Sequence, residues 1–155
     1  MSLEIAYEED DAADEIDLDH VSSVQEQLGQ EFEPDYLDFL GHRNGGRPIR
    51  KYFKAGKHKK AVGKFLCIIE DCETSDHGDD DVSVVWSQIN ERLNEHLIPF
   101  ASVENSEDFL CFNYENKKDI PEIVLWRGLE STDGNPELIP IATTFRKFVS
   151  NLSKV

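Results

Sequence analysis

The segment that most constrains the fold is a helix signal followed by a sharp turn, between residues 34 and 48. Pro34 suits the first turn of a helix, where the missing N–H of a proline leaves no bond unmade. Tyr36, Leu37 and Leu40 form the apolar face of this predicted helix, with Phe39 at its flank. The Asn-Gly-Gly sequence at residues 44–46 accepts positive φ angles, which ends the helix and turns the chain. The segment contains no catalytic motif, so it predicts a scaffold.

Apolar residues at helical spacing predict three more helices, over residues 16–28, 82–93 and 145–152. The expected N-caps of these helices are Asp17 or Asp19, Asp81, and Thr143 or Thr144. Gly29 is expected to end the first of the three helices. Short apolar runs predict strands at residues 49–53, 65–69, 97–101, 109–114, 123–126 and 138–141. The run 65–69 lacks polar alternation, which indicates a strand buried on both faces. Turns are expected at Gly56, Lys59 and Lys60 and over residues 115–121.

The length of 155 residues predicts one domain with a single core, and no apolar run approaches the ~20 residues that span a bilayer. The first residues lack the positive and apolar parts of a signal peptide. Three cysteines, an odd number, argue against a disulfide framework. We therefore expect a cytoplasmic protein that does not bind membranes. Residues 1–13 should form an acidic, flexible tail, because the first fifteen residues hold seven acids and no Lys or Arg, ahead of a domain over 14–155.

Charge is divided unevenly along the chain. The formal net charge of −16 disfavours binding to nucleic acid and favours a basic partner, although an acidic surface can also serve solubility alone. Residues 43–64 hold nine Lys and Arg and no acid, so this segment carries +9 and the remainder −25. The basic segment either faces the acidic loop and tail of the same molecule or forms a solvated hairpin. Nucleic-acid binding, with Tyr52 and Phe53 stacking on bases, is the less favoured alternative.

Motifs for catalysis and metal binding are incomplete. Cys67, Cys72 and His77 lack the fourth ligand and the tight spacing of a zinc site. Residues 76–81 are rich in Asp but lack the alternating acids, central Gly and distal Glu of a calcium loop. The chain contains no Gly-x-Ser-x-Gly elbow, and the glycine pair at 45–46 lacks the Lys-Ser/Thr ending of a phosphate loop. We expect no enzyme activity, no metal and no cofactor.

Seven short strings, in order, resemble the SUKH superfamily of fungal cell-wall synthesis regulators and bacterial immunity proteins. They lie at residues 28–29, 34–40, 44–48, 98–101, 108–111, 124–126 and 139–152, and the resemblance spans 16–152. The chain departs from the family pattern at three positions. Glu33 replaces the usual Leu, Asn113 stands where an Asp often follows the strand, and Arg127 follows Trp126 where an acid is common.

The resemblance implies a single α+β domain, with a mostly antiparallel sheet and helices packed around it, and no enzyme activity. Bacterial members resemble inhibitors that neutralise toxins, often nucleases, whereas fungal relatives act as regulatory hubs. We expect a non-enzymatic immunity protein of a bacterial polymorphic or contact-dependent toxin system, a monomer or weak homodimer. A regulatory interaction module of the same fold, of the cell-wall-regulator type, is the alternative.

The partner expected is a cognate protein toxin with a basic surface, because an acidic inhibitor can mimic the polyanion that a nuclease cleft attracts. The acids that follow residue 69 and those near residue 105 are the expected contact surface. They are Glu70, Asp71, Glu73, Asp76, Asp79, Asp80, Asp81, Glu104, Glu107 and Asp108.

Overall fold

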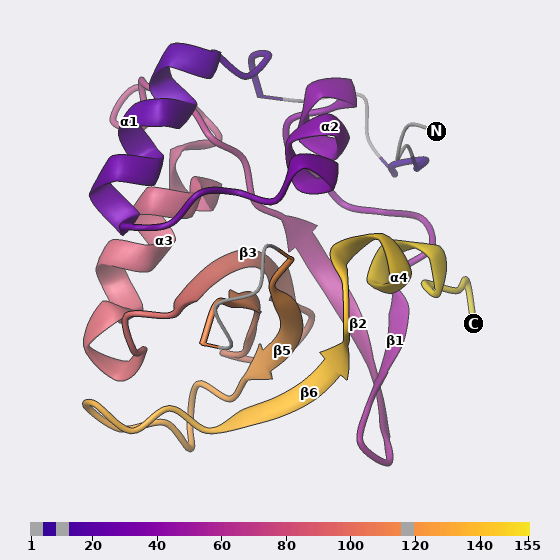
Figure 1. Cartoon of the computed structure of the whole chain (residues 1–155). Helices are drawn as coiled ribbons and strands as arrows, with labels where there is room; N and C mark the ends of the chain where they lie inside the picture. Colours follow the sequence, from indigo (N-terminus) through magenta and orange to yellow (C-terminus); the bar gives the residue numbers. More distant parts are fainter. Residues whose placement is uncertain (1–4, 9–12, 116–119) are drawn as a thin grey trace.

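The computed structural model describes residues 5–8, 13–115 and 120–155, and within them six strands and four α-helices form one α+β domain (Figure 1). The helices are α1 (Leu18–Leu28), α2 (Pro34–His42), α3 (Val82–Ile89) and α4 (Phe145–Ser150), with short 3-10 helices at Gly78–Asp80 and Asn90–Arg92. The strands are β1 (Tyr52–Ala55), β2 (His58–Phe65), β3 (Leu97–Val103), β4 (Phe109–Asn113), β5 (Glu122–Trp126) and β6 (Leu138–Ala142). The predicted fold class is confirmed.

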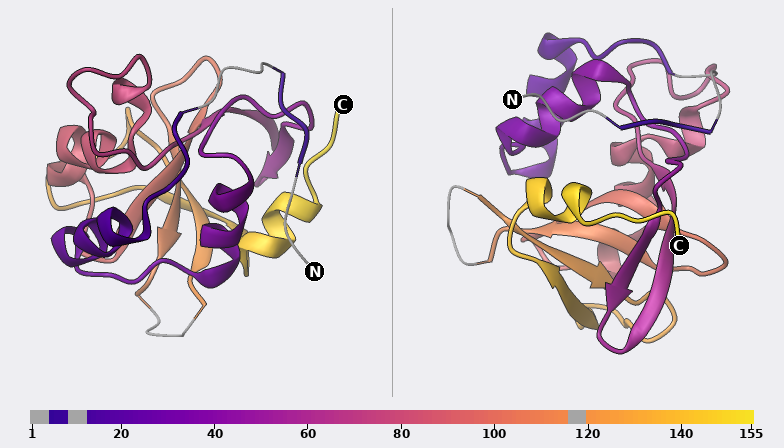
Figure 2. Two further views of the ribbon diagram at one scale, coloured as in Figure 1. Left: turned by 90° about the horizontal axis from the view of Figure 1, so that it is seen from above. Right: turned by 90° about the vertical axis from the view of Figure 1, so that its right-hand side faces the viewer.

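The sheet is an antiparallel meander in which each strand pairs with the next along the chain, in the order β1-β2-β3-β4-β5-β6. One extra residue in β2, between Val62 and Phe65, breaks its register with β3. Such a bulge bends and twists a strand. The sheet curls until its two edge strands, β1 and β6, come into contact. Figure 2 shows the curl from two further directions, with α2 and α4 above it.

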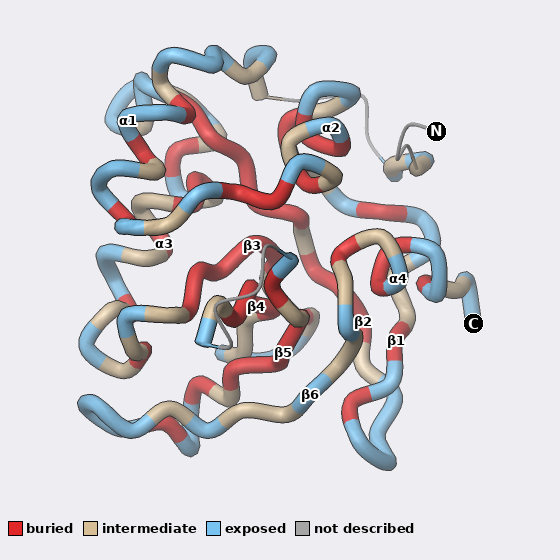
Figure 3. Tube along the Cα trace, in the orientation of Figure 1, coloured by how far each residue is buried: buried red, intermediate tan, exposed pale blue. Residues whose placement is uncertain are grey.

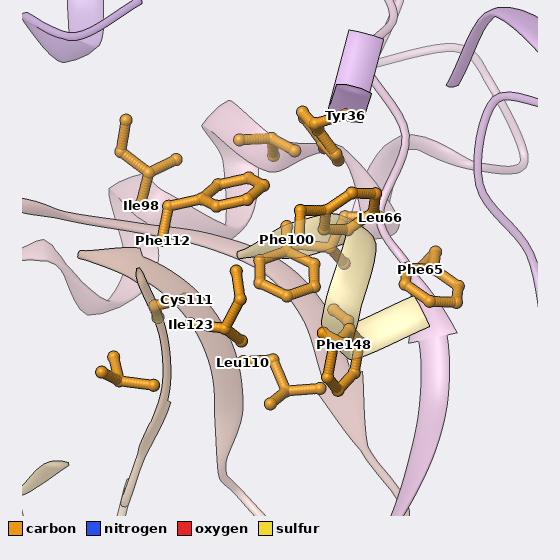
Figure 4. Packing of buried hydrophobic residues seen from close by; sticks show 14 of the residues in the cluster. Tyr36, Phe65, Leu66, Ile98, Phe100, Leu110, Cys111, Phe112, Ile123 and Phe148 are labelled. Carbon is orange, nitrogen blue, oxygen red and sulfur yellow. The ribbon is translucent and has the colours of Figure 1, made fainter. Parts of the chain in front are cut away.

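The core lies between the sheet and the helices that cover it. Helix α4 packs on α2, β5 and β6, and α3 packs on β3. Phe100 of β3 lies among the core side chains, next to Phe112, and the centroids of the two rings are 4.6 Å apart (Figure 4). The ring centroid of Phe145 lies 5.5 Å from that of Phe100. Figure 3 shows that β3, β4 and β5 are almost wholly buried, whereas α1 and α2 expose their outer faces. Aromatic rings in edge and offset contacts therefore hold the helices onto the sheet.

The helix signals in the sequence are confirmed. The side chain of Asp17 caps α1, Asp81 caps α3 and Thr144 caps α4, and Gly29 ends α1 with a φ of 75°. Pro34 opens α2. The predicted apolar face of α2 needs one correction. Phe39 is buried and Leu37 only half-buried, because the core meets α2 on the side of Tyr36, Phe39 and Leu40.

The strands predicted at 49–53 and 65–69 are misplaced, as is the turn between them. Gly56, with a φ of 61°, opens a tight turn between β1 and β2, so the sequence around Lys59 and Lys60 forms part of β2 instead. The run 66–69 is buried as expected but leaves the ladder after Leu66. Cys67 bridges to Asp81, and the backbone N–H groups of the next two residues bond to side chains. The N–H of Ile68 donates to Asn44 Oδ1 and the N–H of Ile69 to Asp81 Oδ2, both at 2.9 Å.

Two sequence predictions fall partly outside the described residues. Positions 116–119 of the turn expected over 115–121 are not among them. Of the expected tail, residues 5–8 and 13 are described, and there Tyr7 forms a bridge with Pro48 while the N–H of Glu8 donates to the carbonyl of Arg47 at 2.8 Å. A domain boundary at residue 13 stays a prediction. Among the helices of the described chain, none has the length and apolar character needed to cross a membrane.

Candidate protein-interaction surface

Asp81 fastens the acidic loop, which we define as residues 70–80. Its side chain is fully buried, and Oδ2 accepts a hydrogen bond from the N–H of Ile69 at 2.9 Å. Oδ1 accepts from the N–H of Val84 at 3.1 Å and from the hydroxyl of Ser83 at 2.6 Å. The first bond joins the two ends of the loop, and the others cap α3. One carboxylate thus ties the loop to the first turn of a helix.

Asn44 fixes the chain just before the loop. Its Oδ1 accepts from the N–H of Ile68 at 2.9 Å, and its Nδ2 donates to the carbonyls of Ile68 at 2.9 Å and Asp14 at 2.7 Å. The next residue, Gly45, has a φ of 88°, and a Cβ there would lie 2.9 Å from the carbonyl oxygen of Phe65. The turn therefore needs glycine at position 45. The hydrogen bonds of Asn44 connect residue 68, just before the acidic loop, to the segment that leads into α1.

Backbone hydrogen bonds within the acidic loop hold its own shape. The N–H groups of Thr74 and Ser75 donate to the carbonyl of Asp71 at 3.1 and 2.9 Å, and the N–H of Gly78 donates to Ser75 at 3.1 Å. Gly78 packs so tightly on Cys72 that a Cβ would collide with the Cys72 carbonyl. Such a loop presents its side chains in a fixed arrangement, which lowers the entropy cost of binding.

The two cysteines near the loop are protonated thiols at neutral pH. Burial, reinforced by the charge of Asp81, raises the pKa of Cys67 to about 12 and that of Cys72 to about 11. Cys67 Sγ lies 3.6 Å from the carbonyl of His77, and Cys72 Sγ donates to Ile69 at 3.3 Å. A thiol held in this form is a poor nucleophile and a poor metal ligand. In the described part of the chain, no group of three or more His, Cys, Asp or Glu is placed to hold a metal ion.

Three of the ten predicted acids pair with the basic segment of the same molecule. Lys64 Nζ lies 2.9 Å from Asp80, Lys51 Nζ lies 3.0 Å from Glu104 and Lys60 Nζ lies 3.8 Å from Asp108. The first pair joins the basic segment to the acidic loop, as one of the two expected arrangements requires, whereas Lys51 and Lys60 meet acids near residue 105 instead of the expected tail. The acidic loop and the acids at residues 104–108 therefore lie beside the same hairpin, because Asp80 and Asp108 both pair with lysines of β2.

The other predicted acids divide between solvent and interior. Those exposed to solvent are Glu70, Asp71, Glu73, Asp76, Asp79 and Glu107. The prediction that Asp81 belongs to the contact surface is corrected, because its side chain is 0% exposed. A carboxylate that satisfies two backbone N–H groups and a hydroxyl has a structural role at this position.

A groove between the start of α1 and the acidic loop brings five carboxylates together. Figure 1 shows the segment that leads into α1 at the upper end of this helix. The groove holds a cavity of about 360 Å³, whose lining includes the buried residues Ile68 and Ile69. Its acids are Asp14, Glu15, Asp17, Glu70 and Asp71. His20 lies among them, with Nε2 3.0 Å from the carbonyl of Ile69 and Nδ1 3.9 Å from Glu70. We call this feature the acidic groove.

Three of the five acids of the acidic groove were absent from the predicted contact surface. Asp14 and Glu15 belong to the run of acids that opens the sequence, and Asp17 carries a helix cap, so each had a simpler explanation. The signal that could have found them is the density of acids on both sides of Ile16. Their position around one cavity with Glu70 and Asp71 follows from the fold, because more than fifty residues separate the two groups.

The comparison with family models decides the family. The model described as the SMI1/KNR4 family (SUKH-1) matches residues 15–151, most of the chain. The chain belongs to the SUKH-1 family. Neither the curated proteins nor the solved structures contain a match. SUKH proteins include both immunity proteins and cell-wall regulators, and both kinds act through contacts with other proteins.

The three departures from the usual SUKH pattern have structural roles here. Glu33 is buried and caps α2 by accepting from the N–H of Tyr36 at 3.2 Å, and burial raises its pKa. Asn113 is buried and accepts from the N–H of Glu115 at 3.0 Å, which ends β4. Arg127 pairs with Glu130 at 3.3 Å. None of the three lines the acidic groove.

Proposed function

We propose that this SUKH protein is an immunity protein that binds and neutralises a cognate toxin through the acidic groove. The observation that carries the proposal is the convergence of Asp14, Glu15, Asp17, Glu70 and Asp71 around one cavity. Lys and Arg side chains of a toxin fit such a site. Their charged ends can form charge-assisted hydrogen bonds with these carboxylates.

The mechanism is occlusion by a mimic of a polyanion. A toxin that acts on nucleic acid, for example, has a basic cleft, and a surface of the opposite sign can cover it. Single exposed ion pairs contribute little, about 0–1 kcal/mol each. The benefit of the cluster lies in association, because steering by charge raises encounter rates by ~10–10³-fold. The anchored loop adds to this by presenting its acids in one arrangement.

The proposal places the protein in the cytoplasm as a monomer or weak homodimer without catalytic activity. The regulatory alternative uses the same groove for a basic partner that is not a toxin. Partner identity separates the two functions, because both belong to the same family.

The test is co-expression with the toxin domain encoded beside the gene. Wild-type protein should restore growth, and Glu70→Lys/Asp71→Lys should lose protection while remaining folded. Asp133→Lys/Glu137→Lys is the matched control, since it makes the same charge change at two exposed positions in the loop between β5 and β6. A chain that protects against no neighbouring toxin, and captures only housekeeping proteins, would contradict the immunity function.

Association kinetics test the mechanism separately. The association rate for the toxin should fall as salt rises from 50 to 500 mM, because salt screens exposed charges. A rate that does not change with salt would reject polyanion mimicry, even if protection is observed.

A further inference from the structure

The two edge strands of the curled sheet enclose a second cavity, away from the acidic groove. It measures about 460 Å³ and lies between β1 and β6, beside α4. Apolar side chains from three elements line it: Phe53 of β1, Ile141 and Ala142 of β6, and Phe148 of α4. The rings of Phe53 and Phe148 meet edge to face at 5.8 Å. This volume falls within the range of ~300–1,000 Å³ that is typical of ligand pockets.

The rim of this cavity is basic in an otherwise acidic protein. Lys54 and Lys59 line it, both exposed, and Lys59 Nζ lies 4.6 Å above the ring of Tyr52. Within the described chain, neither lysine lies in an ion pair with an acid. Lys51, Lys60 and Lys64 of the same hairpin are all paired. A basic rim around an apolar cavity selects acidic ligands that carry an apolar group.

The backbone of β1 is open at the same place. The N–H and C=O of Tyr52 both bond to Ser153, at 3.0 and 3.1 Å, so Tyr52 directs its backbone away from β2. Successive residues of an antiparallel pair alternate in this respect, and the next residue to face outward is therefore Lys54. Among the described residues, nothing pairs with the Lys54 backbone on that side. The open N–H and C=O of Lys54, next to a side-chain pocket, suit hydrogen bonds to one residue of an extended segment.

We propose that this cavity is a docking site for an extended acidic segment of a partner protein. The segment pairs with the open edge of β1 at Lys54, inserts one large apolar side chain between Phe53 and Ile141, and places its acids near Lys54 and Lys59. The site differs in sign from the acidic groove, so one surface binds cationic groups and the other anionic ones. This proposal does not depend on the immunity function.

The experiment uses the full chain and a fluorescent heptapeptide with a central Phe and three acidic residues on each side. Fluorescence anisotropy should show saturable binding that Lys59→Glu weakens roughly tenfold or more. Arg127→Glu is the matched control, because it makes the same charge change away from the cavity and should leave affinity unchanged. Ile141→Ser should weaken binding without any change of charge. Hydrogen exchange of the Lys54 amide should slow when the peptide binds.

Several outcomes would overturn the proposal. One is equal binding by Lys59→Glu and wild type, and another is equal loss in Arg127→Glu, which would show a general charge effect. Tighter binding of a single-stranded oligonucleotide than of the peptide would assign the rim to nucleic acid. A dimer in sedimentation that Lys59→Glu dissociates would assign the cavity to a second copy of the chain.

Discussion

Replacing Asp81 with alanine should lower the free energy of unfolding by about 1.5–5 kcal/mol. Loss of the cap on α3, through the bond to Val84, accounts for about 0.5–2 kcal/mol of this. The remainder comes from the buried N–H of Ile69, which loses its acceptor at a cost of about 1–3 kcal/mol. The free energy of unfolding of small domains is only about 5–15 kcal/mol, so the expected loss is a large part of it.

Urea unfolding followed by tryptophan fluorescence measures this effect, with the midpoint falling at constant slope. Asp81→Ser should be intermediate, because the shorter hydroxyl can still cap α3 but cannot reach Ile69. Asp79→Ala, a change at an exposed acid of the same loop, should stay within about 0.5 kcal/mol of wild type. If Asp81→Ala also stays within that margin, the anchoring role assigned to this carboxylate is refuted.

Two further changes test the packing of the loop and the burial of an acid. Gly78→Ala should destabilise the protein by about 1–3 kcal/mol in urea unfolding, because its Cβ would collide with the Cys72 carbonyl. The control Gly41→Ala has free space in α2 and should stabilise the protein by about 0.5–1 kcal/mol. Equal effects of the two changes would reject the close contact at Gly78. Glu33→Gln should gain stability relative to wild type as pH rises from 4 to 7.5. Burial raises the folded-state pKa of Glu33, so wild type loses stability between the ordinary pKa and the raised one, at about 1.4 kcal/mol per pKa unit, and a difference independent of pH would contradict this.

Local chemistry made the helices predictable, whereas tertiary contacts decided what the sequence could not show. The caps at Asp17, Asp81 and Thr144 involve residues two or three positions apart, so the chain carries their signal directly. The run 66–69 has the composition of a buried strand. Its backbone nevertheless bonds to side chains 12 and 24 residues away, and composition does not show such partners.

The candidate surface follows the same division. An acidic stretch at 70–80 was visible, and so was a basic one at 43–64, but which acids face solvent depends on pairing across the fold. Asp80 meets Lys64 and is partly neutralised, whereas Asp76 and Asp79 remain exposed. Asp81 follows two other aspartates in the sequence, but it is buried because its side chain caps α3. The approach of Asp14 to Glu70 required α1 to be placed beside the loop.

The strict order of the meander has a consequence for how the protein folds as it is synthesised. Every strand pairs with a sequence neighbour, so the sheet can grow strand by strand along the chain, although the connection between β2 and β3 is long because it contains α3. The contacts that close the fold join residues far apart in the sequence. Arg146 of α4 grips Asp35 of α2 with two hydrogen bonds, 111 residues apart, and Ser153 pairs with Tyr52. The sheet can therefore form on the ribosome, but the nascent chain exposes its aromatic core until α4 has left the exit tunnel.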